Sequence, residues 1–181
     1  MPRNLVANFC VLSTLMFSTP ALAAIIIGAA NTPAAPGTTA QVPFTVQKGV
    51  NDAAAFASAT VTFSFSQAAL SAPPTFTASP TSPWPGAFIL GCTFNTPGQA
   101  SCGFATVPPF ANPVVPPGSY TIGTLNLPLA LVISFPQAIN AVIEECTDQS
   151  GSVLPQGSCA AQNGMIIFSE PLPFMFSNGF E

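Results

Sequence analysis

An alternating stretch from Ala57 to Leu70 constrains the fold more than any other part of the sequence. Apolar residues occupy every second position from Ala57 to Phe65, and the positions between them are serines and threonines. Successive side chains of a β-strand point to opposite faces, so this pattern predicts a strand with one buried and one solvated face. The rest of the chain must then supply a cover for the apolar face.

The scarcity of charge narrows the classes of function. Asp, Glu, Lys and Arg make up 4% of the 181 residues, against about 25% in an average soluble domain. The only basic residues are Arg3 and Lys48, and there is no histidine. Nucleic-acid binding depends on many basic contacts to phosphate, so we expect no nucleic-acid partner. Few charges together with 21 Pro and 13 Gly are more typical of an all-β extracellular protein than of a cytosolic enzyme.

The first residues have the features of a secretory signal peptide. Arg3 supplies a positive charge, and residues 5–17 form an apolar run that is too short to span a bilayer. The small-x-small sequence Ala21-Leu22-Ala23 predicts cleavage between Ala23 and Ala24; the alternative is an uncleaved anchor. No later stretch is long enough to cross a membrane as a helix, so we expect no transmembrane segment after removal of the signal.

Cleavage would remove Cys10 and leave an even number of cysteines. These are Cys92, Cys102, Cys146 and Cys159. In a secreted chain they indicate two disulfides, with three possible connectivities. The simplest connectivity pairs Cys92 with Cys102 and Cys146 with Cys159. The first pair would centre a hairpin on Pro97, with Gly98 in the left-handed position. A zinc site is not expected, because the sequence has no CxxC spacing and no histidine.

The remaining segments predict an all-β fold. Short apolar or alternating runs predict strands at residues 24–30, 40–48, 75–78, 88–94, 100–107, 119–127, 138–145 and 164–169, with a further apolar run at 129–135. Pro43 indicates an edge strand or a bulge. Tyr120 and Ile122 are expected to oppose Leu125 and Leu127. No stretch of ten or more residues shows helical periodicity, so the fold class is a two-sheet antiparallel β-sandwich of jelly-roll type with about eight or nine strands.

Reactive side chains are few. Without histidine, neither a Ser-His-Asp nor a Cys-His arrangement can form, and Glu144 and Glu145 are expected to point to opposite faces of one strand. We therefore expect no enzyme. Asp148, Glu145 and loop carbonyls could hold Ca²⁺, but the preferred interpretation is that these acids are solvated, and no cofactor is expected.

Two aromatic residues are candidates for ligand contact. Trp84 lies between Pro83 and Pro85 on a proline-rich connector, and Trp84 with Tyr120 is the tentative sugar-stacking pair. The alternative is that Trp84 packs over the end of the sandwich. The Ser/Thr face of the strand at 57–65 is either a solvated sheet face or a flat, neutral docking face.

Several motifs in this order resemble a known family. An early apolar strand is followed by Pro36-Gly37, by the sequence VPFTV at 42–46 and by the alternating strand that ends in SQAAL at 66–70; CTDQSG at 146–151 and NGMIIF at 163–168 come late. This set resembles the cohesin-like domains of bacterial secreted proteins over roughly residues 24–169. The resemblance implies a cohesin-like sandwich that takes part in protein interaction. At Ser66-Gln67 the sequence departs from the usual Asp-Pro, and no binding residue transfers by motif.

The C-terminus resembles a second pattern. Its last residues, FSNGFE, are similar to Phe-x-Asp-Gly-Phe-Glu endings of exported gammaproteobacterial proteins. The resemblance implies a Gram-negative source and a location in the periplasm, at the surface or outside the cell; a frayed terminus is the alternative. The expected organisation is a signal peptide at 1–23, a cohesin-like sandwich at 24–169 and a tail at 170–181. The expected function is a secreted, non-enzymatic module for protein interaction or cell-surface structure, with an unknown protein or cell-envelope partner. The alternative is a carbohydrate-binding module that binds a glycan through Trp84.

Overall fold

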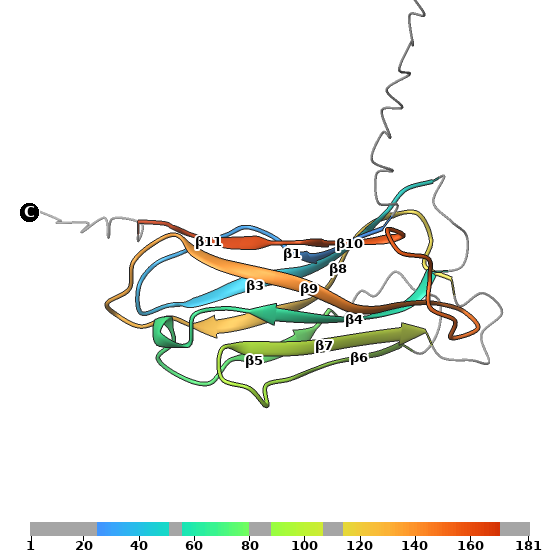
Figure 1. The fold of residues 1–181 in the computed structure, drawn as a ribbon. Coiled ribbons are helices and arrows are strands. Elements are labelled where there is room, and N and C mark those ends of the chain that lie inside the picture. The colour runs from blue at the N-terminus through green and yellow to red at the C-terminus, as the bar shows by residue number, and fades with distance from the viewer. Residues whose placement is uncertain (1–24, 51–55, 80–87, 107–113, 171–181) are drawn as a thin grey trace, which may run out of the picture.

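The computed structural model describes residues 25–50, 56–79, 88–106 and 114–170, with the side chains of 88–90 and 106 excepted. Within these ranges the chain forms eleven strands and one short 3₁₀ helix, η1 (Gln67–Ala69), and the strands build two stacked sheets (Figure 1). The five-stranded sheet has the order β10 (Cys159–Gln162), β1 (Ile25–Ala29), β3 (Thr39–Lys48), β8 (Gly118–Pro128) and β5 (Thr75–Ala78). The six-stranded sheet has the order β2 (Thr32–Ala34), β11 (Gly164–Phe168), β9 (Gln137–Asp148), β4 (Phe56–Ser64), β7 (Gln99–Thr106) and β6 (Phe88–Thr93).

The predicted fold class, an all-β two-sheet sandwich, is confirmed. Most neighbours pair antiparallel, but β1 pairs with β10 and β2 pairs with β11 in parallel. The sequence predicted eight or nine strands and missed β2 and β10, because runs of three or four residues are too short to show a period. The described residues contain no helix that is long and apolar enough to cross a membrane.

The alternation that dominates the sequence lies in β4, between β7 and β9. Ala59, Val61 and Phe63 are buried, and the hydroxyl residues between them face outward and are half-buried. The strand predicted to run to Leu70 is too long: β4 ends at Ser64, and Gln67–Ala69 form η1. Leu70 then forms an isolated β-bridge with Leu129, which directly follows β8 of the five-stranded sheet.

Phenylalanine rings join the two sheets at the centre of the core. The ring of Phe44 on β3 lies edge-on to Phe63 on β4, with centroids 5.0 Å apart. Phe104 on β7 contacts Phe44 at 6.0 Å and Phe56 at 5.7 Å. Edge-to-face pairs place the positive ring edge against the negative ring face, so these contacts add to the gain from apolar burial.

Of the two alternatives predicted at Pro43, an edge strand or a bulge, the structure shows an irregularity next to Pro43 and no edge, whereas the prediction for β8 is wrong. Pro43 does not mark an edge, because β3 lies between β1 and β8. The pairing of β3 with β8 shifts between Phe44 and Thr45, which leaves Ile122 as an extra residue on β8. Ile122 and Leu125 are consequently both fully buried instead of opposing each other. An inserted residue reverses the alternation that follows it, and the sequence does not reveal such an insertion.

The apolar run at 129–135 forms no strand but the connection from β8 to β9. Leu129 is buried, yet Leu131 and Val132 are 82% and 92% exposed. The chain leaves the sheet here because the backbone of 129–130 hydrogen-bonds to the turns at Thr38 and Ala69 instead of to a neighbouring strand.

Both cysteine pairs are the sequence neighbours. Cys92 and Cys102 lie directly opposite each other on β6 and β7, with Cα atoms 4.0 Å apart. Their hairpin turns at Gly98, which has a φ of 73°. The Cα atoms of Cys146 and Cys159 are 6.6 Å apart, and this bond links β9 of one sheet to β10 of the other.

Candidate functional site

The outer face of the six-stranded sheet carries rows of small, neutral side chains. On β4 the outward residues are Ser58, Thr60, Thr62 and Ser64. Across the hydrogen-bonded registers they meet Ala105, Gly103, Ser101 and Gln99 of β7 on one side, and Thr147, Glu145, Val142 and Asn140 of β9 on the other. Because antiparallel partners share a face, these residues form one continuous surface.

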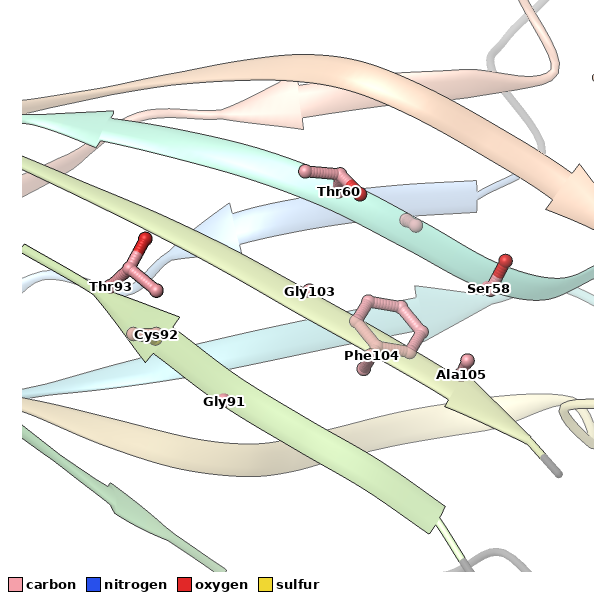
Figure 2. A pocket seen from close by; sticks show the side chains of 9 residues that line it. Ser58, Thr60, Gly91, Cys92, Thr93, Gly103, Phe104 and Ala105 are labelled. Carbon is pink, nitrogen blue, oxygen red and sulfur yellow. The ribbon is translucent and has the colours of Figure 1, made fainter.

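Two glycines open a hollow in this surface. Gly103 pairs with Thr60 on one side and with Gly91 of β6 on the other, and Figure 2 shows the three residues in a row across β4, β7 and β6. A Cβ atom on Gly91 would meet nothing within 4 Å, and one on Gly103 would meet only the Thr60 hydroxyl, at 3.9 Å. The missing side chains leave a groove of about 440 Å³, which we call the glycine groove. Its lining residues are Ser58, Ala59, Thr60, Gly91, Cys92, Thr93, Gly103, Phe104 and Ala105.

The floor of the glycine groove is held firmly. Phe104 and Cys102, the inward neighbours of Gly103, are 2% and 0% exposed and belong to the core cluster. The Cys92–Cys102 disulfide ties β6, the edge strand of this sheet, to β7. The hairpin turn is fastened as well, because the Gly98 N–H donates to Oε1 of Gln67 at 3.0 Å and the Phe65 N–H donates to the Gly98 carbonyl at 2.9 Å.

Charge on this face is sparse and negative. Glu145 pairs with Thr60 beside the groove. A register shift leaves Glu144 without a partner position on β4, and the side chains of Glu144 and Glu145 are both exposed. The prediction that the two glutamates point strictly to opposite faces therefore does not hold at this shift.

Lys48, the one basic residue in the described ranges, is 7% exposed and donates from Nζ to the Val115 carbonyl at 2.8 Å.

Asp148, which the sequence offered only as an alternative Ca²⁺ ligand, closes its own loop. Its Oδ1 accepts hydrogen bonds from Ser150 N–H at 2.7 Å, from Ser150 Oγ at 2.6 Å and from Ser152 N–H at 3.0 Å. The Ser150 hydroxyl first, and then the Ser152 N–H, hold the pKa of this carboxyl below its usual range, since they stabilise the charged form. In the parts of the chain that the structure describes, no three His, Cys, Asp or Glu side chains converge as a metal site.

Of the two tentative aromatic residues, only Tyr120 belongs to the described part of the chain. Trp84 lies outside the described residues, as do the cleavage site at Ala23 and Ala24 and the tail from 171 onward. Tyr120 is half-buried against the core, and its hydroxyl donates to the Pro117 carbonyl at 2.8 Å and the Pro116 carbonyl at 3.1 Å. This tyrosine fixes the proline-rich entry to β8.

Sequence reasoning identified the hydroxyl row of β4 but missed the glycine groove. A usable signal was present: once Cys92 is placed opposite Cys102, Gly91 must lie opposite Gly103. Both glycines then occupy the outward positions next to inward cysteines. The position of Thr60 beside this pair depends on the pairing of β4 with β7, which no local pattern gives.

Comparison with known proteins shows the fold. No protein-family model and no curated protein matches the sequence. Among solved structures, a cohesin from Acetivibrio cellulolyticus scaffoldin B, in complex with a Cel5 dockerin variant, is 13% identical, with a TM-score of 0.61 over 80% of this chain and 99% of that one. A non-cellulosomal cohesin from the archaeon Archaeoglobus fulgidus is 17% identical, with a TM-score of 0.56 over 80% and 91%. The cohesin CaCohA2, in complex with a dockerin variant, is 17% identical, with a TM-score of 0.57 over 80% and 99%. The sandwich is therefore cohesin-like.

Proposed function

We propose that this chain is a secreted, non-enzymatic module that docks a protein partner on the outer face of its six-stranded sheet. The observation that carries the proposal is the glycine groove, a hollow of about 440 Å³ in a face of mostly small and neutral side chains. Several of the cohesins with this fold are described in complex with dockerins, which supports a protein as the partner.

The physical character of the face suits protein docking. Burial of a hydroxyl costs less than burial of an unpaired charge, and a partner that hydrogen-bonds the hydroxyl offsets that cost. Glycine at Gly91 and Gly103 lets a partner side chain approach the backbone closely. A fixed floor also lowers the cost of ordering on binding, because the Cys92–Cys102 bond already holds the edge strand.

The cell envelope or the exterior of a Gram-negative bacterium is the proposed location. Two disulfides indicate an oxidising compartment, and the apolar leader before Ala24 supports export. The ending FSNGFE supports the Gram-negative assignment through its resemblance to exported proteins. The partner is then a protein of the same compartment.

The test fills the groove. Gly103→Thr adds a side chain into open space and places a β-branched residue in a strand, so the fold should be retained. Immobilised wild-type chain should capture a partner from an envelope or secreted fraction, and a purified dockerin panel serves as a defined probe. Affinity for the captured partner should fall by about tenfold or more, equivalent to about 1.4 kcal/mol.

Thr121→Gln is the matched control. Thr121 is exposed on β8 of the opposite sheet, so this change should leave the affinity as it is. Equal binding by wild type and Gly103→Thr, measured by calorimetry with the same partner, would refute docking at the glycine groove.

A glycan is the alternative ligand, through Trp84 on its proline-rich connector. A glycan array probed with wild type and with Trp84→Ala separates the two proposals. Binding to a sugar that disappears with Trp84→Ala and persists with Gly103→Thr would replace the protein-docking proposal by a carbohydrate-binding one.

A further inference from the structure

One end of the sandwich exposes a second surface, of a different kind. In the β8–β9 connection Leu131 is 82% and Val132 is 92% exposed, and Ile167 and Phe168 at the end of β11 are 45% and 49% exposed. With the half-buried Phe135, the side chains of Leu131, Val132 and Phe168 form what we call the end patch, and Ile167 lies beside it on the other face of β11. Exposed aliphatic and aromatic side chains that gather on one surface are typical of an interaction site.

Contacts between these segments link the parts of the end patch to one another. The rings of Phe135 and Phe168 lie edge-on, with centroids 5.6 Å apart, which joins the β8–β9 connection to β11. The turn at Gly37 joins the same connection to β2, because its N–H donates to the Ala130 carbonyl at 3.1 Å and the Leu131 side chain lies against its Cα. β2 in turn pairs with the end of β11. In Figure 1 this end is on the left, where β8 passes into β9.

The described chain ends at the end patch. After Phe168 the N–H of Ser169 donates to the Ala34 carbonyl at 3.0 Å, and Glu170 is the last described residue. Residues 171–181 follow, with the sequence PLPFMFSNGFE, in which Glu181 is the only charged residue. Their apolar residues are Leu172, Phe174, Met175, Phe176 and Phe180. Extended, these eleven residues reach about 35 Å, more than enough to pass over the β8–β9 connection.

We propose that residues 171–181 fold back over the end patch and cover Leu131 and Val132. The free energy falls when two apolar surfaces leave water together. Only Ser169 and Glu170 separate the segment from Phe168, so its effective concentration at the end patch is on the order of millimolar. A free partner in dilute solution would have to compete with that concentration. The proposal is independent of the glycine groove, which is built on β4, β7 and β6.

A photo-crosslink tests the contact directly. p-Benzoylphenylalanine at Phe176 in the full chain should crosslink, within one molecule, to peptides covering residues 129–137. The matched control is the same probe at Val50, which is 83% exposed but follows β3 at the other end of the sandwich, and it should not label those peptides. Mixing ¹⁵N-labelled and unlabelled chains distinguishes crosslinks within a chain from those between chains. Label found only between chains assigns the end patch to a second copy and overturns the proposal.

A second experiment measures the exposed surface without a crosslinker. A chain shortened after Glu170, and the full chain with Phe174→Ser and Phe176→Ser, should both bind the apolar dye anilinonaphthalene sulfonate several-fold more strongly than wild type. Adding Leu131→Ser and Val132→Ser to the shortened chain should return the dye signal to the wild-type level, because the uncovered side chains are then gone. Unchanged dye binding in both tail variants, with circular dichroism showing an intact sandwich, would overturn the proposal.

Discussion

The glycine groove and the end patch are two accessible surfaces built by opposite means. The groove lies on paired strands, its floor is packed core, and it is made by side chains that are missing at Gly91 and Gly103. The end patch lies mainly on the β8–β9 connection, with Phe168 of β11 beside it, and its most exposed side chains are the large ones of Leu131 and Val132. A surface on a sheet is shaped before any ligand arrives, whereas a surface on a connection can adapt to what covers it.

The largest expected difference concerns the support beneath each surface. Phe104 lies under the groove and contacts the rings of both Phe44 and Phe56, so Phe104→Ala should lower the free energy of unfolding by about 3–5 kcal/mol. Leu131→Ala removes a side chain that is 82% exposed and should change it by less than about 0.5 kcal/mol. Urea denaturation of the two variants measures the contrast. Equal losses would mean that the end patch is structural.

Removal of the Cys92–Cys102 bond should act on one surface only. Replacing both cysteines by alanine should cost about 2–3 kcal/mol, the value expected for closing a short loop. Hydrogen exchange of β6 should speed up, since this edge strand pairs only with β7. Dye binding at the end patch should stay at the wild-type level. Faster exchange at 129–137 would show that the two regions unfold together.

Substitution of glycine by alanine should have opposite effects on stability at a glycine that faces open space and at a glycine that is packed against a side chain. Gly103→Ala adds a methyl group to open space and should stabilise the fold by about 0.5–1 kcal/mol, because glycine loses more conformational freedom in a strand. At Gly123 a Cβ atom would clash with the Phe76 ring, so Gly123→Ala should destabilise. Thermal unfolding of both variants shows whether each change raises or lowers the stability. Destabilisation by Gly103→Ala would mean that the groove is not open space.

The smallest expected effect is a pH dependence in the loop after β9. Asp148 has a lowered pKa in the folded chain, so its contribution to stability is complete above the unfolded pKa of about 3.9 and is lost as pH falls through the folded value. In the Asp148→Asn variant, the midpoint of urea unfolding should therefore change less between neutral and acidic pH than it does in the wild type. The end patch contains no ionisable side chain, so its dye response should not change with Asp148→Asn. A midpoint profile identical to that of wild type would contradict the role of these hydrogen bonds.

Particular residues show how far the sequence can be read. The hydroxyl and apolar alternation of β4 and the opposition of Cys92 to Cys102 follow from period and turn chemistry, which act locally. The burial of Ile122 does not, because the inserted residue in β8 is defined only against β3. The exposure of Leu131 and Val132 contradicts their hydrophobicity, and only the path of the chain out of the sheet explains it. The groove required the pairing of β4 with β7, strands separated by some forty residues of sequence.

The parallel pairing of the first strands with the last ones has a mechanical consequence. β1 runs beside β10 and β2 runs beside β11, each pair in the same direction. Tension applied to the two sides of the domain, before β1 and after β11, pulls the partners in opposite directions along their common axis. The hydrogen bonds of each pair then share the load and must yield together, instead of opening one at a time. A domain with this arrangement resists stretching between the start of its first strand and the end of its last one.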